Sequence, residues 1–360
     1  MGPLLIEKPR IPFKEILLFG LWPNALKILI YRLRGYKIGK GVKIGPGSVV
    51  CGDHEVEIGD YTTIGFLTIV RGKNIRIGSF VKIGSMTFLD CPNTEIGEGS
   101  KINEQVFVGG LQDHDSFFKL GRNCQIMQMS FINPARSIVV GDDSGIGGNC
   151  SVFGHTSWLS QFEGYAVDFA PIEIGKSVSV AWGVFLLPGT KIGDGSVVGA
   201  QSVVHGTVPP QSMAIGFPAR IIARAPDFPK PVTDDDKVAM FRNIVSEMVG
   251  YFVGSELACE RQGDLYEIRQ PSRGWWQRDR GPMRLKVVEG DPCAAAKNLP
   301  AELHVFLSLQ EIPADVRKGL SLRGTKWIDI ARKEQSRDFN DLGDEVILYL
   351  KRYGVRTNRC

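Results

Sequence analysis

Residues 174–204 read IGKSVSVAWGVFLLPGTKIGDGSVVGAQSVV, and the spacing of their aliphatic side chains decides the fold. A large aliphatic residue recurs at every sixth position, namely at Ile174, Val180, Leu186, Ile192, Val198 and Val204. Small or β-branched residues stand four positions after several of these, at Val178, Val184, Ser196 and Ser202. An α-helix would place apolar residues three or four apart, and a half-buried strand would alternate by two along its whole length. The period of six therefore predicts short strands separated by tight turns.

The same period extends back through the chain to residue 38. The aliphatic residues fall into groups of three, and within each group the spacing is six. The earlier groups are Ile38, Ile44 and Val50; Ile58, Ile64 and Val70; Ile77, Ile83 and Leu89; Ile96, Ile102 and Val108; Leu120, Ile126 and Ile132; and Val140, Ile146 and Val152. Three six-residue faces make one turn of a triangular prism, and successive turns stack by parallel backbone hydrogen bonds. Residues 37–225 are therefore predicted to form a mainly β domain, a hexapeptide-repeat parallel β-helix of about eight coils.

Composition narrows the classes of function. Hydrophobic residues make up 43% of the chain and charged residues 23%, which is typical of a globular protein. The net charge of +4 over 360 residues argues against nucleic-acid binding by bulk electrostatics. The seven cysteines include no C-x-x-C pair, so we expect no disulfide framework or structural zinc, and a reducing cytoplasm. Cys124 and Cys150 occupy the small inner position of the repeat and are predicted to be core residues.

The stretch from residue 11 to residue 34, IPFKEILLFGLWPNALKILIYRLR, is more apolar than the rest of the chain. Charged residues and Pro23 interrupt it, whereas a membrane-spanning helix needs about 20 mostly apolar residues in a row. Residues 1–36 are therefore expected to form short helices that cap the open end of the repeat, without the layout of a signal peptide. Trp22 and the basic residues among the leucines leave an alternative open, a peripheral membrane contact through residues 11–34.

Two long insertions interrupt the repeat, at residues 109–119 and 153–173. The extra residues between groups all fall at the same corner of the prism, so both insertions are predicted to project from one edge. Four of the five histidines lie at or just after this corner: His54, His114, His155 and His205. Loops held on a rigid scaffold are where function usually lies, and this edge is the predicted functional edge.

The segment from residue 148 to residue 222 resembles the left-handed β-helix acyltransferases, a family of sugar and small-molecule O- and N-acetyltransferases. The last coils of that family typically end in LPG-x-x-IG-x-G-x-x-[IV]-GA-x-SVV, followed by a VPP turn and a G-x-PA-[KR] segment. Here the motifs are LPG (187–189), IGDG (192–195), VGA (198–200), SVV (202–204), VPP (208–210) and GFPAR (216–220). The resemblance covers about half the chain. It implies a transferase that uses acetyl-CoA or another acyl-CoA, and a homotrimer with sites between adjacent prisms.

The resemblance also implies a catalytic base. His155 stands where the family carries its catalytic histidine, and the free pKa of imidazole suits a general base near neutral pH. Glu163 or Asp168 could hold its second ring nitrogen. His114, Trp158 and Asp168, from the two insertions, are the candidate contacts of a sugar or other small-molecule acceptor.

Contacts with coenzyme A are implied at the last coils, where small residues let a ligand approach the backbone. The candidate residues are Ala181, Trp182, Gly183 and Ala200, with Arg220 for the phosphates. One departure concerns the same place, because the family often has Trp-Ile-Gly where this chain reads SVA at residues 179–181.

Two other classes of function stay open. The SVA departure is compatible with a non-catalytic β-helix scaffold or binding module that carries a degenerate site. A γ-type carbonic anhydrase also uses a left-handed β-helix and binds zinc through three histidines. This chain has no H-x₄-H pair, however, and one histidine per coil does not readily make a tetrahedral site, so no metal is expected.

The remainder of the chain, residues 226–360, is expected to be a small α/β domain of unknown role. It begins with PDFPKP (226–231), which is typical of a linker, and Thr233 then precedes three aspartates as a helix N-cap does. That helix is predicted to run to about residue 253, followed by strands at 265–269, 283–288 and 303–309 and a closing helix at 344–353. Trp275 and Trp276 are expected to pack in a core or interface, with acceptor or partner binding as the alternative.

Overall fold

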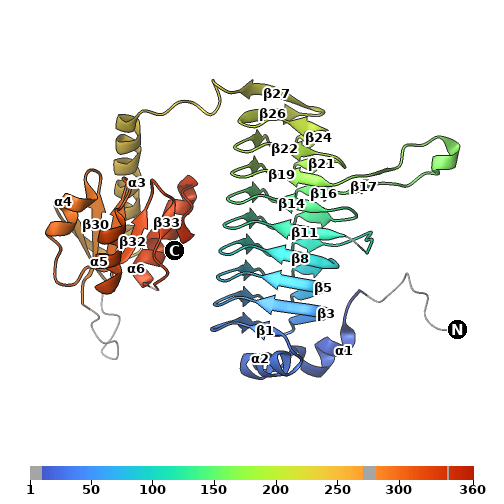
Figure 1. Cartoon of the computed structure of the whole chain (residues 1–360), viewed down its shortest axis with the longest axis horizontal. Coiled ribbons are helices and arrows are strands. Elements are labelled where there is room, and N and C mark those ends of the chain that lie inside the picture. The colour runs from blue at the N-terminus through green and yellow to red at the C-terminus, as the bar shows by residue number, and fades with distance from the viewer. Residues whose placement is uncertain (1–9, 115, 271–280, 339) are drawn as a thin grey trace. The chain divides into compact units, whose positions relative to one another are not determined.

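Short parallel strands, stacked coil upon coil, form the first part of the chain. The computed structural model describes residues 10–114, 116–270, 281–338 and 340–360, and the chain divides into two units after Pro231. Figure 1 shows the stack of the first unit running from α2 (Asn24–Leu33) to β27 (Ala219–Arg224). Inward aliphatic residues pair with their counterparts in the next coil, as Val180 does with Ile146 and with Val198. The predicted mainly β architecture with parallel strands is confirmed.

The strands form three rows, one for each face of the stack. Row one contains β1 (Lys37–Ile38), β8 (Asn93–Ile96), β11 (Phe117–Leu120), β14 (Ile138–Val140), β19 (Ile172–Ile174), β22 (Lys191–Ile192) and β25 (Thr207–Val208). Row two contains β2 (Lys43–Ile44), β4 (Thr63–Ile64), β6 (Lys82–Ile83), β9 (Lys101–Ile102), β12 (Gln125–Ile126), β15 (Gly145–Ile146), β20 (Ser179–Val180), β23 (Val197–Val198) and β26 (Ser212–Gly216). Row three contains β7 (Phe88–Asp90), β10 (Phe107–Val108), β13 (Phe131–Asn133), β16 (Ser151–Phe153), β21 (Phe185–Leu186) and β24 (Val203–Val204). Two longer strands, β3 (Val49–Ile58) and β5 (Ile69–Ile77), pass from row three into row one.

The small inner residues tie consecutive coils together through their side chains. The Ser144 hydroxyl donates to the Gly175 carbonyl at 2.8 Å and accepts from the Val178 amide at 2.9 Å, so one side chain serves two coils. The Cys150 thiol takes the same position, with its Sγ 3.1 Å from the Ala181 carbonyl. Cys124 and Cys150 are both buried, and burial raises the pKa of the Cys150 thiol. The prediction that these two cysteines are core residues is confirmed.

Short helices lie against the first coil. They are α1 (Phe13–Glu15), the π-helical turn η1 (Ile16–Gly20) and α2. The Lys27 ammonium of α2 is buried and donates to the Gly45 and Ser48 carbonyls at 2.7 and 3.1 Å. These carbonyls lie at the open end of the stack, so the cap satisfies backbone groups that have no earlier coil to pair with. Among the described residues, no helix is long and apolar enough to cross a membrane.

The second unit is a seven-stranded sheet with helices on both faces. Its strands, in spatial order, are β28 (Ala258–Gln262), β29 (Leu265–Arg269), β30 (Met283–Val288), β31 (Val305–Ser308), β32 (Lys326–Asp329), β33 (Glu334–Gln335) and β34 (Asn358–Arg359). One face is covered by α3 (Asp234–Gly254) and α6 (Asp341–Leu350), and the other by α4 (Pro292–Lys297) and α5 (Ala314–Leu322). Thr233 and Asp236 form a capping box at the start of α3, where the sequence predicts a helix N-cap. Trp275 and Trp276 lie outside the described residues.

Candidate active site

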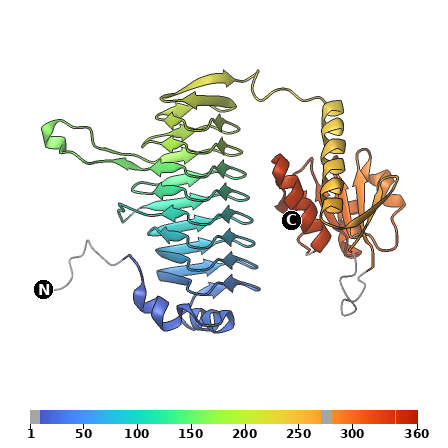
Figure 2. The ribbon, with the colours of Figure 1, turned by 180° about the vertical axis from the view of Figure 1, so that it is seen from behind.

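The second insertion is a β-hairpin that leaves the stack directly after row three. Its strands are β17 (His155–Thr156) and β18 (Asp168–Phe169), and Figures 1 and 2 show it projecting from the coils. Gly154 forms its base, where the Gly154 amide donates to the Asn133 carbonyl at 2.9 Å. A Cβ atom at Gly154 would lie 2.9 Å from the Arg136 backbone nitrogen, so a larger residue would push the hairpin off the coil below. The residue before His155 is therefore held firmly on the stack.

His155 lies in an aromatic environment that covers one side of its ring. The imidazole stacks on Phe153 with ring centroids 6.1 Å apart and meets the edge of Phe169 at 5.7 Å. Its Nδ1 atom is buried and has no hydrogen-bond partner within the described part of the chain. Burial lowers the pKa of His155 from its usual 6.5, because a low-dielectric surrounding disfavours the charged imidazolium. At neutral pH the ring is consequently neutral, which is the form that accepts a proton.

Arg136 links the two insertions, and nothing in the sequence pattern singles it out. Its guanidinium donates to the Asp113 carboxylate at 2.9 Å and lies over the Phe169 ring at 5.7 Å. Asp113 also accepts from the His114 ring at 2.7 Å. The His114 ring and amide, together with Arg136, lower the pKa of Asp113 to about 2. The loop that carries His114 and the hairpin that carries His155 thus meet at one arginine, which comes from the turn between β13 and β14.

Two buried polar groups lie close to this edge, and the sequence pattern does not predict either of them as a site residue. Asn133, at the end of β13, is buried, and its Oδ1 has no hydrogen-bond partner among the described residues. Asp90 ends the row-three strand two coils earlier, and burial raises the pKa of its carboxyl group. Both follow an inward aliphatic residue directly, which is the place where each strand turns the corner. An unpaired buried amide costs free energy unless water or a ligand satisfies it.

Neither carboxylate suggested for orienting His155 reaches its ring. In the hairpin His155 lies opposite Phe169, and Thr156 lies opposite Asp168. Because neighbouring residues of a strand point to opposite faces, the Asp168 side chain is on the face away from His155. Glu163 belongs to the short helix η2 (Gln161–Glu163) in the outer part of the hairpin and is exposed. The expectation that either holds the imidazole is therefore wrong for this structure, and aromatic packing positions the ring instead.

The candidate coenzyme A contacts lie at a different corner, between rows two and three. The amides of Ala181 and Gly183 are already used, since they donate to the Val198 and Gly148 carbonyls at 2.9 Å each. The amide of Trp182 has no such partner among the described residues. Its indole packs closely on Gly148, where a Cβ atom would lie 2.4 Å from the indole ring and would force the ring to move. The amide of Ala200, at the equivalent position one coil further along, likewise has no backbone partner among the described residues.

The remaining candidates are exposed. Ala200 lies at the same corner as Trp182, one coil further along, and Arg220 lies in β27 beyond the last coil. Trp158, in the outer part of the hairpin, is 96% exposed. His155 follows row three and Trp182 precedes it, so a whole face separates the two within one chain. The structure thus brings together His155 and the His114 loop, and it does not bring either to Trp182.

No zinc arrangement is seen in the part of the chain that the structure describes, where no three His, Cys, Asp or Glu side chains are placed to share a metal ion. His54 lies within β3 and His205 follows β24, each on a different coil from His155.

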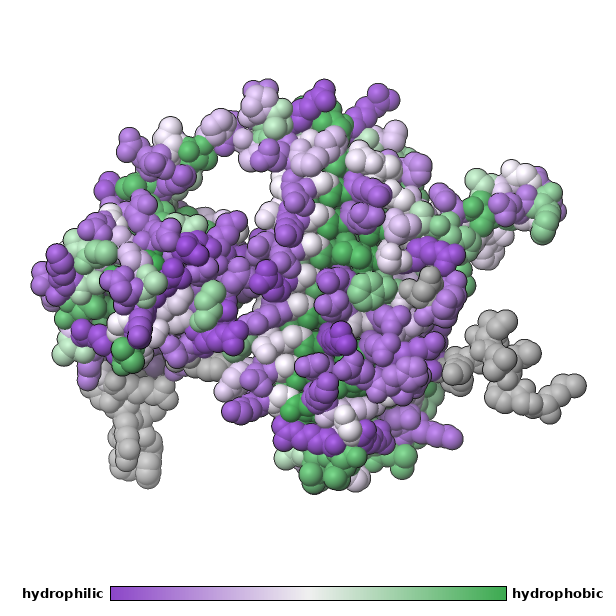
Figure 3. Space-filling view, in the orientation of Figure 1, coloured by the Kyte–Doolittle hydropathy of each residue, from purple (hydrophilic) through white to green (hydrophobic). Residues whose placement is uncertain are grey.

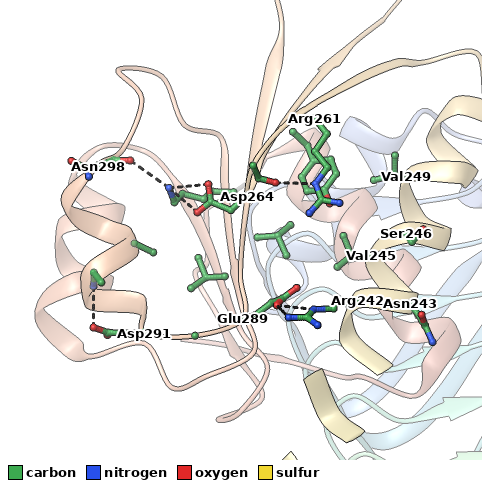
Figure 4. A pocket seen from close by; sticks show the side chains of 18 residues that line it. Arg242, Asn243, Val245, Ser246, Val249, Arg261, Asp264, Glu289, Asp291 and Asn298 are labelled. Atoms are coloured by element: carbon green, nitrogen blue, oxygen red, sulfur yellow. Dashed lines mark hydrogen bonds and ion pairs between the residues drawn. The ribbon is translucent and has the colours of Figure 1, made fainter. Parts of the chain in front are cut away.

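A pocket does occur in the second unit (Figure 4), between α3, the β28–β29 turn and α4. Its charges are largely paired internally, with Arg242 on Glu289 at 2.7 Å and Lys286 on Asp264 at 3.1 Å. It contains none of the site residues that the sequence predicts.

Relatives among known proteins match parts of this chain. No protein-family profile matches it. Over 103 residues it is 31% identical to a protein named as an acetyltransferase in Schizosaccharomyces pombe, covering 28% of this chain and 47% of that one. Over 77 residues it is 39% identical to a protein so named in Staphylococcus aureus, covering 21% and 38%. Over 135 residues it is 32% identical to galactoside O-acetyltransferase of Escherichia coli K12, covering 35% and 63%. The chain thus spans about half or less of the first two of these curated relatives.

Solved structures agree only loosely. A hexapeptide-repeat acetyltransferase of Vibrio cholerae superimposes with a TM-score of 0.27 at 20% identity, covering 60% of this chain and 89% of the other. The resemblance to acetyltransferases is nevertheless confirmed by the sequence relatives.

Proposed function

We propose that the chain is an acyl-CoA-dependent transferase, most simply an acetyltransferase, built on a left-handed β-helix of about eight coils. One observation carries the proposal. A histidine whose pKa is lowered by burial stands at the base of a hairpin, beside coils related in sequence to acetyltransferases. The acceptor is proposed to be a hydroxyl or amine of a sugar or another small molecule. All seven cysteines are free thiols, and this supports the proposal that the protein acts in a reducing cytoplasm.

The proposed reaction needs one base and no covalent enzyme intermediate, because the thioester is already activated. His155 takes the proton from the acceptor oxygen or nitrogen as that atom forms its bond to the thioester carbonyl carbon. The carbon–sulfur bond then breaks, and the proton passes from the imidazole to the departing thiolate. Since Nδ1 is buried, Nε2 is the nitrogen proposed to accept the proton.

The Trp182 amide is proposed to stabilise the negative charge that develops on the carbonyl oxygen. It has no backbone partner among the described residues, so it needs no rearrangement before it donates. Gly183, with φ +71°, and Ala200 keep the corner free of bulk, and the small Ala181 does the same. Coenzyme A would therefore lie along this corner, and Arg220 is proposed to meet its phosphates.

A homotrimer is proposed because one chain holds only half of such a site. His155 and Trp182 stand at opposite edges of row three. The outer side of that row carries a column of stacked phenylalanines, with successive ring centroids 5.0 to 5.3 Å apart: Phe88, Phe107, Phe131, Phe153 and Phe185. A second copy packed on this column would cover apolar surface and bring its own Trp182 corner towards His155.

The acceptor is proposed to bind between the two insertions. Trp158 offers a ring face for stacking on a sugar, and His114 and Asp168 offer polar contacts. The unpaired Asn133 carboxamide, at the foot of the hairpin, is a further group that an acceptor hydroxyl could satisfy. A sugar acceptor is consistent with the galactoside named for the Escherichia coli relative.

Turnover and binding, measured separately, test the proposal. Acetyl-CoA consumption over a panel of sugar and amine acceptors is compared for wild type, His155→Gln and the control His54→Gln, whose exposed side chain lies on a distant coil. Loss of a general base lowers turnover by roughly 100- to 10,000-fold. We expect that loss for His155→Gln alone, with coenzyme A binding by calorimetry unchanged. A wild type that does not bind coenzyme A would leave the non-catalytic scaffold as the better account, and equal turnover in both variants would exclude His155 as the base.

A further inference from the structure

The cap of the first unit exposes an unusually apolar face. Eight large apolar side chains of η1, α2 and their flanks point to solvent: Phe13, Leu17, Leu18, Leu21, Trp22, Leu26, Leu29 and Leu33. Leu17, Leu21 and Leu33 are 84%, 76% and 78% exposed. Figure 3 shows this face as a hydrophobic patch at the end of the stack that carries α2. We call these eight residues the cap face.

The cap face exists because α2 is turned the opposite way from an ordinary surface helix. A surface helix normally buries its leucines and exposes its lysines. In α2 the buried residues are Lys27 and Tyr31. Lys27 donates to two carbonyls of the first coil, and the Tyr31 hydroxyl accepts from the Val50 amide at 2.9 Å. These polar anchors fix the leucines outward, so the exposure is built into the fold.

Exposed basic residues lie in the same segment of the chain as the cap face. Lys14, Arg32, Arg34 and Lys40 are exposed, and the one acidic residue between positions 10 and 40 is Glu15. The Arg32 guanidinium is held by the Ile38 carbonyl at 2.9 Å. Exposed cations interspersed with exposed leucines and a tryptophan are what an anionic lipid surface attracts.

We propose that the cap face is a peripheral membrane-binding surface that docks onto bilayers containing anionic lipid. It does not span the bilayer, because α2 has ten residues and covers about 15 Å, against a hydrocarbon core of about 30 Å. A second copy is a poorer occupant, since two cap faces in contact would bring their basic residues together. The proposal does not depend on the acyltransferase activity.

Vesicle flotation of the full chain tests the proposal. Vesicles of phosphatidylcholine alone are compared with vesicles of phosphatidylcholine and phosphatidylserine. We expect the wild type to float with the anionic vesicles, and raised salt to weaken this because the attraction of the basic residues is electrostatic. The double variant Leu21→Glu, Leu29→Glu is expected to lose at least about tenfold in bound fraction. The double variant Lys14→Gln, Lys40→Gln is expected to bind the anionic vesicles more weakly than the wild type does, with no change for vesicles of phosphatidylcholine alone.

The matched control is Leu322→Glu, which changes an 80% exposed leucine in the second unit and should leave flotation unchanged. Circular dichroism melting checks that every variant is folded. Wild-type protein that stays in the bottom fraction with both vesicle types would overturn the proposal. A second result would also overturn it. If light scattering showed that the wild type forms a dimer that does not bind vesicles, and that Leu21→Glu with Leu29→Glu makes it monomeric, the cap face would bind a second copy of the chain.

Discussion

At the scale of single residues, His155 shows how packing prepares a side chain for proton transfer. Its ring is bounded by Phe153 and Phe169, and no carboxylate is bonded to it in the described structure. A carboxylate partner would favour the imidazolium, whereas aromatic burial favours the neutral ring. Desolvation therefore shifts the proposed base further towards its unprotonated form.

This predicts the pH dependence of the reaction. Because burial lowers the pKa of His155, the acidic limb of the kcat/KM profile should have its midpoint below pH 6.5. Phe153→Ala would uncover the ring and should move the acidic limb up towards the ordinary histidine value. The check is a pH–rate profile of both proteins with one acceptor. An acidic limb above pH 6.5 in the wild type, or no movement in the variant, would contradict burial as the cause.

At the scale of the coil, close approach between turns determines which residues fit. The Gly147 amide donates to the Val180 carbonyl at 2.7 Å, and its carbonyl accepts from the Ser130 hydroxyl at 2.9 Å. A Cβ atom on Gly147 would come within 2.5 Å of the Ala181 carbonyl carbon, which is backbone and cannot turn aside. Glycine at position 147 therefore allows the two coils to stack closely. This contact positions the next coil at Ala181, beside Trp182.

Gly147→Ala should consequently destabilise the first unit by about 1 to 3 kcal/mol, the usual cost of overpacking a closely packed site. Urea denaturation followed by circular dichroism measures the change. The matched control is Gly250→Ala in α3, where nothing lies within 4 Å of the new methyl group. That change should be neutral or stabilising by roughly 0.5 to 1 kcal/mol, because alanine is the better helix former. If the two substitutions changed the free energy of unfolding equally, the close contact between coils at Gly147 would not be the cause of the destabilisation.

At the scale of the whole molecule, the column of phenylalanines on row three is the surface that assembly would bury. The rings stack along the coils, and His155 stacks on the column through Phe153. A site divided between the two edges of this row would give activity only in the oligomer. Assembly and catalysis should therefore be lost together.

Phe131→Asp should convert the proposed trimer into monomers and abolish transfer, because an unpaired carboxylate would be buried at the interface. Phe80→Asp is the control, since Phe80 stacks on Tyr61 away from row three. Size-exclusion chromatography with light scattering reports the mass, and melting by circular dichroism confirms that the monomer is folded. A wild type that is monomeric and fully active would contradict the divided site.

The coils could be predicted from the amino-acid sequence. The period of six, the small inner residues and the shared corner of the insertions are local features, because each coil contacts only its neighbours and register follows from spacing. Cys124 and Cys150 could be recognised as core for that reason. The same repeat indicated a capping role for the first helices.

Features that depend on contacts between distant segments became visible in the folded chain and not before. Strand alternation in the hairpin turned Asp168 away from His155, and hydrogen bonds between coils occupied the amides of Ala181 and Gly183 but not that of Trp182. Arg136 joined two insertions that are separate in sequence. Lys27 turned the leucines of α2 towards solvent, because its buried ammonium donates to carbonyls of the first coil that have no earlier coil to pair with. Loops and ends lack the repeat that fixes the coils, so their side chains are placed by non-local packing that no local spacing encodes.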